Sequence, residues 1–106
     1  MTDRQGVSGR YKNANADSED ALCDALLTLK TREEVRRFLY DVCTPKEIAD
    51  LSDRWCVARL LHEGKLSYRE IHALTGVSVT TIGRVARFLQ QEPYEGYKIA
   101  LERVDS

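Results

Sequence analysis

The chain has 106 residues, a formal net charge of −1 and 31% charged residues, and this length fits one domain with a modest core. Its three cysteines form no C-x-x-C pair and have no neighbouring histidine, which argues against a disulfide framework or a zinc site and favours a reducing, cytoplasmic environment. No apolar stretch approaches the roughly 18 residues that a membrane-spanning helix needs, and the first residues contain no hydrophobic signal core.

The first part of the chain differs in composition from the rest. Residues 1–16 are rich in glycine, serine and asparagine and poor in apolar side chains, which predicts a flexible, unpacked tail. Arg4, Arg10 and Lys12 make a basic arm on DNA the alternative interpretation of this segment. From residue 17 to residue 106, helical periodicity predicts a single helical domain.

Two amphipathic helices are predicted after the tail. The first begins at Ser18 and ends near Leu29 and Lys30, and Thr31 opens the second, with Glu34 placed to close a capping box. The apolar faces that we expect to be buried are Leu22, Leu26 and Leu29 in the first helix and Val35, Phe38, Leu39 and Val42 in the second. Neither helix has a pattern typical of catalysis.

The third predicted helix has the clearest start signal in the chain. Thr44 is an N-cap, Pro45 suits the first helical position, and Glu47 closes a capping box. The helix ends at Gly64 and is about 18 residues long, which is enough for a central helix on which others pack. Its expected core residues are Ile48, Leu51, Trp55, Ala58 and Leu61, and Arg59 is expected in solvent.

Residues 67–89 predict a helix-turn-helix. Ser67 and Glu70 form a capping box at the start of its first helix, and Ile71 and Leu74 are expected to face inward. Gly76 follows directly, where a helix needs a residue that tolerates positive φ in order to end.

The second helix of this motif starts after a cap at Ser78 or, if it begins later, at Thr80. Its expected apolar stripe is Val79, Ile82, Val85, Ala86 and Leu89, and its polar face is Thr80, Thr81, Gly83, Arg84 and Arg87. No carboxylate occurs between residues 76 and 91. Hydroxyls, threonine methyls and arginines suit a recognition helix in the major groove of DNA; a capped helical hairpin with a solvated polar face is the alternative.

A last helix is predicted to begin at Pro93. Its apolar residues are Tyr97, Ala100, Leu101 and Val104. This segment could complete the core of a monomer or cross to a second subunit, and periodicity does not distinguish the two.

Opposite charges separate along the domain. Residues 59–91 hold five basic and two acidic side chains, a net charge of +3, whereas residues 17–53 hold ten acidic and five basic ones, a net charge of −5. The positive field therefore belongs to the helix-turn-helix, as binding to phosphate would require.

Several motifs between Thr44 and Leu89 together resemble the Trp repressor family, in a match without gaps. They are T-P-x-E at 44–47, Arg54, L-L-x-x-G at 60–64, S-x-R-E at 67–70 and G-x-x-x-x-T-I-x-R at 76–84. The resemblance implies an all-α helical array in an intertwined homodimer that represses transcription by placing two recognition helices in successive major grooves. Two-fold symmetry then predicts a roughly palindromic operator with half-sites about one helical turn apart.

The resemblance also implies which residues face DNA. Carried over by position, they are Arg69, His72, Ser78, Val79, Thr80, Thr81 and Gly83, and the polar face of the second helix adds Arg84 and Arg87. Arg69 is the best candidate for a bidentate contact with guanine.

Thr44, Arg54 and Arg84 match the positions that hold the tryptophan co-repressor in the Trp repressor. Two arginines can flank a planar ring and hold its carboxylate. However, Val85 and Phe88 replace smaller residues of the family and would fill the space of an indole ring. We therefore expect that tryptophan does not bind and that any effector is unknown, as in the tryptophan-repressor-related bacterial proteins; the arginines then have structural or phosphate-binding roles.

The sequence thus favours a sequence-specific DNA-binding regulator that acts as a homodimer. The alternative is a helical interaction module that binds protein through the same surface, which the overall acidity motivates. An enzyme is the weakest hypothesis, because His62 and His72 have no nucleophile, paired carboxylate or metal-ligand spacing around them. No cofactor, metal or catalytic residue is predicted.

Overall fold

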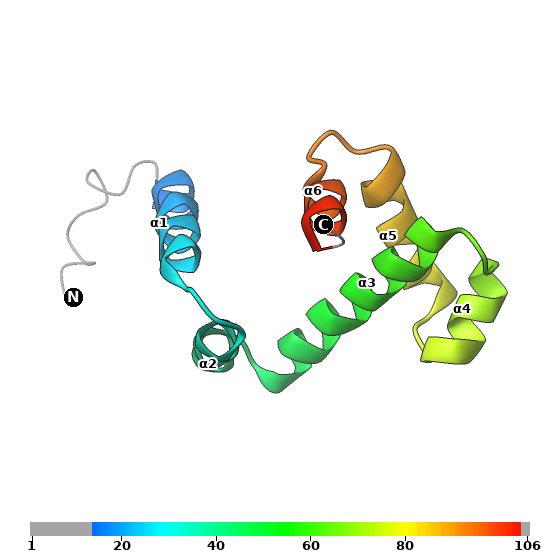
Figure 1. Cartoon of the computed structure of the whole chain (residues 1–106), viewed down its shortest axis with the longest axis horizontal. Coiled ribbons are helices and arrows are strands. Elements are labelled where there is room, and N and C mark those ends of the chain that lie inside the picture. Colours follow the sequence, from blue (N-terminus) through cyan, green and yellow to red (C-terminus); the bar gives the residue numbers. More distant parts are fainter. Residues whose placement is uncertain (1–13, 105–106) are drawn as a thin grey trace. The chain divides into compact units, whose positions relative to one another are not determined.

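The computed structural model describes residues 14–104, and these form six α-helices without strands (Figure 1). The helices are α1 (Ala14–Thr28), α2 (Arg32–Val42), α3 (Pro45–Glu63), α4 (Tyr68–Thr75), α5 (Val79–Gln90) and α6 (Gly96–Val104). The chain divides into two compact units, the first ending at Val42 and the second beginning at Cys43. The predicted all-α class is confirmed.

Helix α1 in the first unit begins four residues before Ser18, the start predicted from the sequence. Most of the predicted tail, with the cations of the proposed basic arm, lies outside the described residues. Thr31 caps α2 as predicted, because its hydroxyl accepts a hydrogen bond from the Glu34 amide at 3.0 Å. The Glu34 carboxylate accepts from the amide of Lys30 at 2.8 Å, one residue before the position expected in a capping box.

The apolar faces of α1 and α2 are not buried, which contradicts the prediction. Leu22 and Leu26 are 44% and 41% exposed, Val42 is 55% exposed, and Phe38 and Leu39 are only half-buried. These apolar side chains lie largely at the surface of the single chain. Apolar side chains at helical spacing normally pack against another element.

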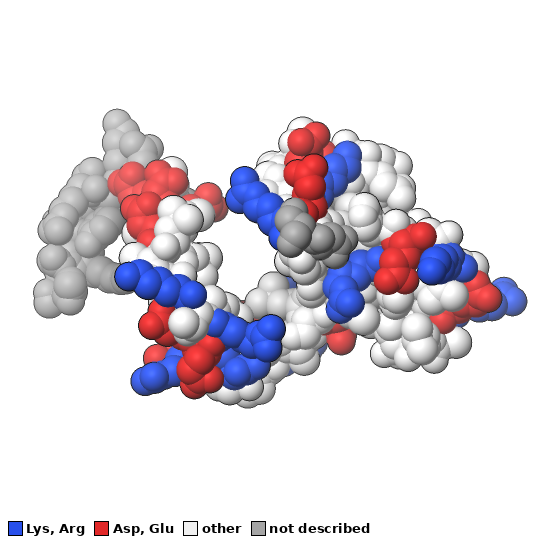
Figure 2. Space-filling view, in the orientation of Figure 1, with Lys and Arg blue, Asp and Glu red and all other residues white. Residues whose placement is uncertain are grey.

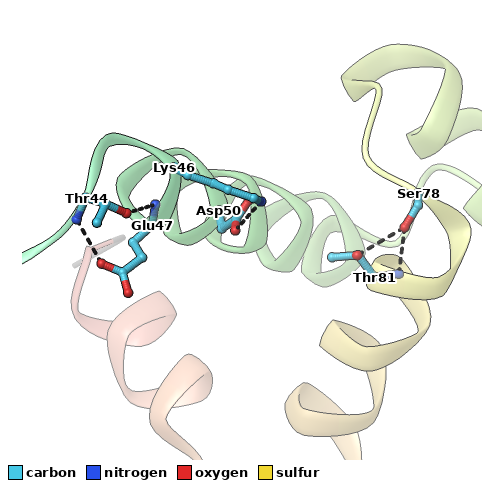
Figure 3. A network of polar contacts seen from close by, with 6 residues as sticks. All are labelled: Thr44, Lys46, Glu47, Asp50, Ser78 and Thr81. Atoms are coloured by element: carbon cyan, nitrogen blue, oxygen red, sulfur yellow. Dashed lines mark hydrogen bonds and ion pairs between the residues drawn. The ribbon is translucent and has the colours of Figure 1, made fainter.

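The start and end of α3 match the prediction. The Thr44 hydroxyl accepts from the Glu47 amide at 3.1 Å, and the Glu47 carboxylate accepts from the Thr44 amide at 2.8 Å (Figure 3). Gly64, at φ 72°, ends the helix after 19 residues. Only the C-terminal half of α3 enters the core: Ala58 is fully buried as expected, whereas Leu51 is 43% exposed.

Helices α4, α5 and α6 gather around this C-terminal half of α3 (Figure 1). The buried cluster between them consists of Val57, Ala58, Ile71, Val77, Ile82 and Val85. Leu101 of α6 is also buried, and the rings of Trp55 and Tyr97 stack with centroids 6.5 Å apart, which joins α3 to α6. The helix-turn-helix of α4 and α5 therefore packs on α3 and α6 through one shared buried cluster.

Two predicted core residues of the helix-turn-helix are exposed. Leu74 is 67% exposed because Thr75, one full turn after Ile71, takes the inner position at the end of the short helix α4. Val79 is 50% exposed because it lies at the first turn of α5, at the edge of the buried stripe.

Helix α6 begins at Gly96 and not at Pro93, so the predicted start was wrong by three residues. Residues 91–95 form a turn in which Glu95 has φ 58°, a left-handed conformation that interrupts the helical path. Among the described helices, none combines the length and apolar character needed to cross a membrane.

Ile71→Ala should lower the free energy of unfolding by about 2–5 kcal/mol, because a fully buried side chain would leave a cavity. Leu74→Ala, on the same helix, should change it by less than about 0.5 kcal/mol. Urea denaturation at one protein concentration measures both. Equal losses for the two variants would contradict the observed packing of α4.

Candidate nucleic-acid interface

Helix α4 is fixed at both ends by the residues that the sequence singled out. The Ser67 hydroxyl accepts from the Glu70 amide at 3.1 Å, and the Glu70 carboxylate accepts from the Ser67 amide at 2.8 Å. At the other end Gly76 has φ 79°, and its amide donates to the His72 carbonyl at 2.8 Å. The predicted capping box and glycine stop are both confirmed.

Helix α5 starts after a cap at Ser78, the first of the two predicted alternatives. The Ser78 hydroxyl accepts from the Thr81 amide at 3.1 Å and donates to the Thr81 hydroxyl at 3.0 Å (Figure 3). The connection from α4 is thus only three residues long, Gly76 to Ser78, and both of its ends are hydrogen-bonded. Such a connection restricts the angle at which α5 leaves α4.

The two faces of α5 differ sharply in burial. Four residues of the predicted stripe, Ile82, Val85, Ala86 and Leu89, are at most 6% exposed. Thr80, Arg84 and Arg87 on the opposite face are exposed, and Thr81 and Gly83 are intermediate. A Cβ atom added at Gly83 would meet nothing within 4 Å, so no packing within the chain requires this glycine. Gly83 leaves this part of the polar face of α5 without a side chain.

Both arginines of this face interact with neighbouring residues. The Arg84 guanidinium carbon lies 4.4 Å from the centroid of the Phe88 ring, and that of Arg87 lies 5.7 Å from it. The Phe88 ring in turn stacks on Tyr94, with centroids 6.3 Å apart. A guanidinium held over an aromatic face keeps its N–H groups available at its edge.

Glu92 is a residue of this surface that the sequence analysis missed. Its carboxylate forms an ion pair with Nε of Arg87 at 2.8 Å. The backbone brings the two together, because the amide of Glu92 donates to the carbonyl of Arg87 at 3.1 Å as the helix ends. The sequence analysis considered carboxylates only up to residue 91, and Glu92 is the next residue.

Arg69 and His72, the predicted contacts on α4, are both exposed. Arg69 has no ion pair within residues 14–104. The His72 ring is engaged by the protein itself, since its Nδ1 lies 2.7 Å from the Val77 carbonyl oxygen.

The three candidate effector residues have different surroundings. Thr44 uses its hydroxyl to cap α3. Arg54 is half-buried in a polar depression of about 320 Å³ between α3 and the turn before α5. Arg84 is not among the residues that line this depression, and its guanidinium covers Phe88. The other charged residues of the depression are Lys46, Asp50 and Asp53, of which Lys46 and Asp50 form an ion pair at 3.1 Å.

Charges of both signs occur over the second unit. On the face shown in Figure 2, acidic and basic side chains alternate on the part that carries α3 to α6. Helix α5 itself carries Arg84 and Arg87 and no acidic residue. Its exposed face is therefore the part of the motif best suited to a polyanion.

The family comparison extends over both units. A family model described as Trp repressor protein matches residues 17–105, which include most of α1 and all of the other five helices. The chain belongs to the Trp repressor family. This family is one of regulators and not of enzymes, and the motifs between Thr44 and Leu89 had indicated it correctly.

Three bacterial proteins illustrate the similarity. The uncharacterized protein YerC of Bacillus subtilis (strain 168) is 45% identical over 85 residues, which are 80% of each chain. A TrpR-like protein from Eubacterium eligens ATCC 27750 has a similar crystal structure, with a TM-score of 0.77 and 39% identity over 84% of this chain and 90% of that one. A candidate Trp repressor from Staphylococcus aureus has a TM-score of 0.78 and 37% identity, covering 90% and 93% of the two chains.

Proposed function

We propose that this member of the Trp repressor family is a dimeric, sequence-specific DNA-binding protein that represses transcription. The observation that carries the proposal is the exposed polar face of α5, the second helix of a capped helix-turn-helix. This face contains no carboxylate. In this account the N-terminal turn of α5 enters the major groove, with Thr80 and Val79 against base edges and methyl groups.

The remaining candidate residues lie on later turns of α5 and on α4. Arg84 and Arg87 extend from later turns of the same face and suit phosphate or guanine. Arg69 projects from α4, the helix that crosses the DNA backbone in proteins of this kind. Ser78 and Thr81 act mainly through each other, since their hydroxyls are hydrogen-bonded at the start of α5.

Homodimer formation supplies the partner for the exposed apolar faces. Leu22, Leu26, Val42 and Leu51 are each more than 40% exposed in the single chain. Exposed apolar side chains on each unit are typical of interaction surfaces in soluble proteins. We propose that a second copy covers them and that the two recognition helices then face two half-sites of a palindrome.

Dimer formation can be tested from the mass of the protein in solution. Light scattering at micromolar concentration should report a mass about twice the 12.1 kDa of one chain. A species of 12.1 kDa under these conditions would contradict the dimer, since the exposed apolar faces would then remain uncovered.

We propose that tryptophan is not the effector. Val85 is 1% exposed and belongs to the core cluster, so its bulk is part of the fold. Arg84, one of the two arginines that would flank a ligand ring, already covers the ring of Phe88. The position of an aromatic ligand against Arg84 is thereby taken by a side chain of the protein.

A protein-binding module without DNA affinity is the second candidate function. The mixed charges of the second unit and the Arg87–Glu92 ion pair favour it, because both weaken the attraction for phosphate. Salt dependence separates the two: each phosphate contact lowers the logarithm of the binding constant by about 0.9 per tenfold rise in salt. A protein partner that binds with an affinity insensitive to salt would favour the protein-binding module.

Arg69→Ala should weaken binding to a selected duplex site by about 1–3 kcal/mol if the arginine contacts guanine, and should relax the preference for that base. Arg59→Ala is the matched control, because it removes an exposed arginine from α3. Fluorescence anisotropy with matched and mutated duplexes measures both effects. Equal weakening on every sequence would leave Arg69 as a phosphate contact only, and no weakening would remove it from the interface.

Glu92→Gln should strengthen DNA binding by roughly two- to fivefold for each subunit bound, because it releases one Arg87 per subunit from an ion pair worth up to about 1 kcal/mol. The salt dependence should steepen at the same time, by up to about 0.9 per subunit, as expected for one added phosphate contact each. Glu95→Gln removes the same charge nearby without an ion pair to Arg87 and serves as control. An equal gain for Glu95→Gln would show that only the net charge matters.

A further inference from the structure

His72 joins the end of α4 to the start of α5 through two groups. Its carbonyl oxygen accepts from the amide of Gly76 at 2.8 Å, which closes the last turn of α4. Its ring Nδ1 lies 2.7 Å from the carbonyl oxygen of Val77, two residues before α5. The main chain and the side chain of one residue thus hold both halves of the connection.

The geometry determines the role of each ring nitrogen. A carbonyl oxygen can only accept a hydrogen bond, so Nδ1 of His72 must carry a proton and donate it to Val77. The preceding peptide group is held as well, because the Val77 amide donates to the Thr75 hydroxyl at 3.0 Å. The Val77 side chain is 7% exposed in the core cluster. Only Nε2 of His72 remains available for a partner outside the chain.

We propose that His72 is a positioning residue for DNA recognition, and that it acts through the Nδ1–H···O=C bond to Val77 and not by direct contact with DNA. This inference rests on the proposed DNA-binding function. The bond fixes the peptide that precedes the Ser78 cap, and the cap fixes the first turn of α5. An error of about 1 Å in that turn would misplace every base contact that follows it.

Two near-isosteric variants separate the two ring nitrogens. His72→Asn places an amide N–H where Nδ1 lies and removes the Nε2 edge, whereas His72→Gln places its amide near Nε2 and removes the bond to Val77. The proposal predicts that His72→Asn retains DNA affinity within about twofold. His72→Gln and His72→Ala should each lose roughly three- to tenfold, the factor expected for one hydrogen bond.

If His72 only stabilised α4, the two variants would rank in the opposite order, so the test distinguishes positioning of α5 from general stability. Glutamine is the better helix former, so a residue that merely supported α4 would tolerate glutamine better than asparagine. Affinity is therefore measured by anisotropy on a selected duplex well below the unfolding temperature, with unfolding curves recorded for all variants. Retention by His72→Gln and loss by His72→Asn would show direct contact through Nε2 and overturn the proposal. Unchanged affinity in all three variants would overturn it as well.

A readout without DNA separates failure of this inference from failure of the proposed function. Amide hydrogen exchange in the free protein reports the first turn of α5, where the amides of Thr81 and Ile82 donate to Ser78. These amides should exchange roughly three- to tenfold faster in His72→Gln than in His72→Asn. Equal rates would overturn the positioning role even if DNA binds. The expected difference in a protein that binds no duplex would retain the structural link and contradict only the DNA-binding function.

Discussion

The left-handed backbone at Gly76 is the constraint on which the rest of the second unit depends. At φ 79° a residue with a side chain would be strained by about 1–2 kcal/mol. Because the chain reverses there, Val77 enters the core beside Ile71 and Ile82, and Ser78 caps the next helix three residues after α4 ends. The buried side of α5 is then set by packing, and its polar side must face solvent.

The parts of this arrangement that depend on local chemistry were predictable from the sequence. The capping boxes at Thr44 and Ser67 and the glycine stop at Gly76 are decided by hydrogen bonds within four residues, and all three are present. Burial was less predictable, because periodicity identifies an apolar side without identifying what covers it. For this reason the faces of α1 and α2 and the side chain of Leu74 were wrongly placed in the core.

In the candidate site, too, features set by local spacing were predictable and contacts between elements were not. The exposed face of α5 followed from helical spacing and is confirmed as exposed at Thr80, Arg84 and Arg87. The contacts that modify it arise where the chain changes direction, so spacing along a helix did not reveal them. The Arg87–Glu92 ion pair forms as α5 ends, and the His72–Val77 hydrogen bond forms across the turn before α5 starts.

Sequence-specific DNA binding is tested most directly by selection of binding sites from a random pool of duplex DNA with the purified 106-residue chain. A homodimer that reads the major groove should enrich a near-palindrome with half-sites about one helical turn apart. The enriched duplex should bind about 10³-fold or more tightly than unrelated sequence and with a steep dependence on salt. Failure to enrich any sequence, repeated with a mixture of metabolites that includes tryptophan, would contradict the account and favour the protein-binding module.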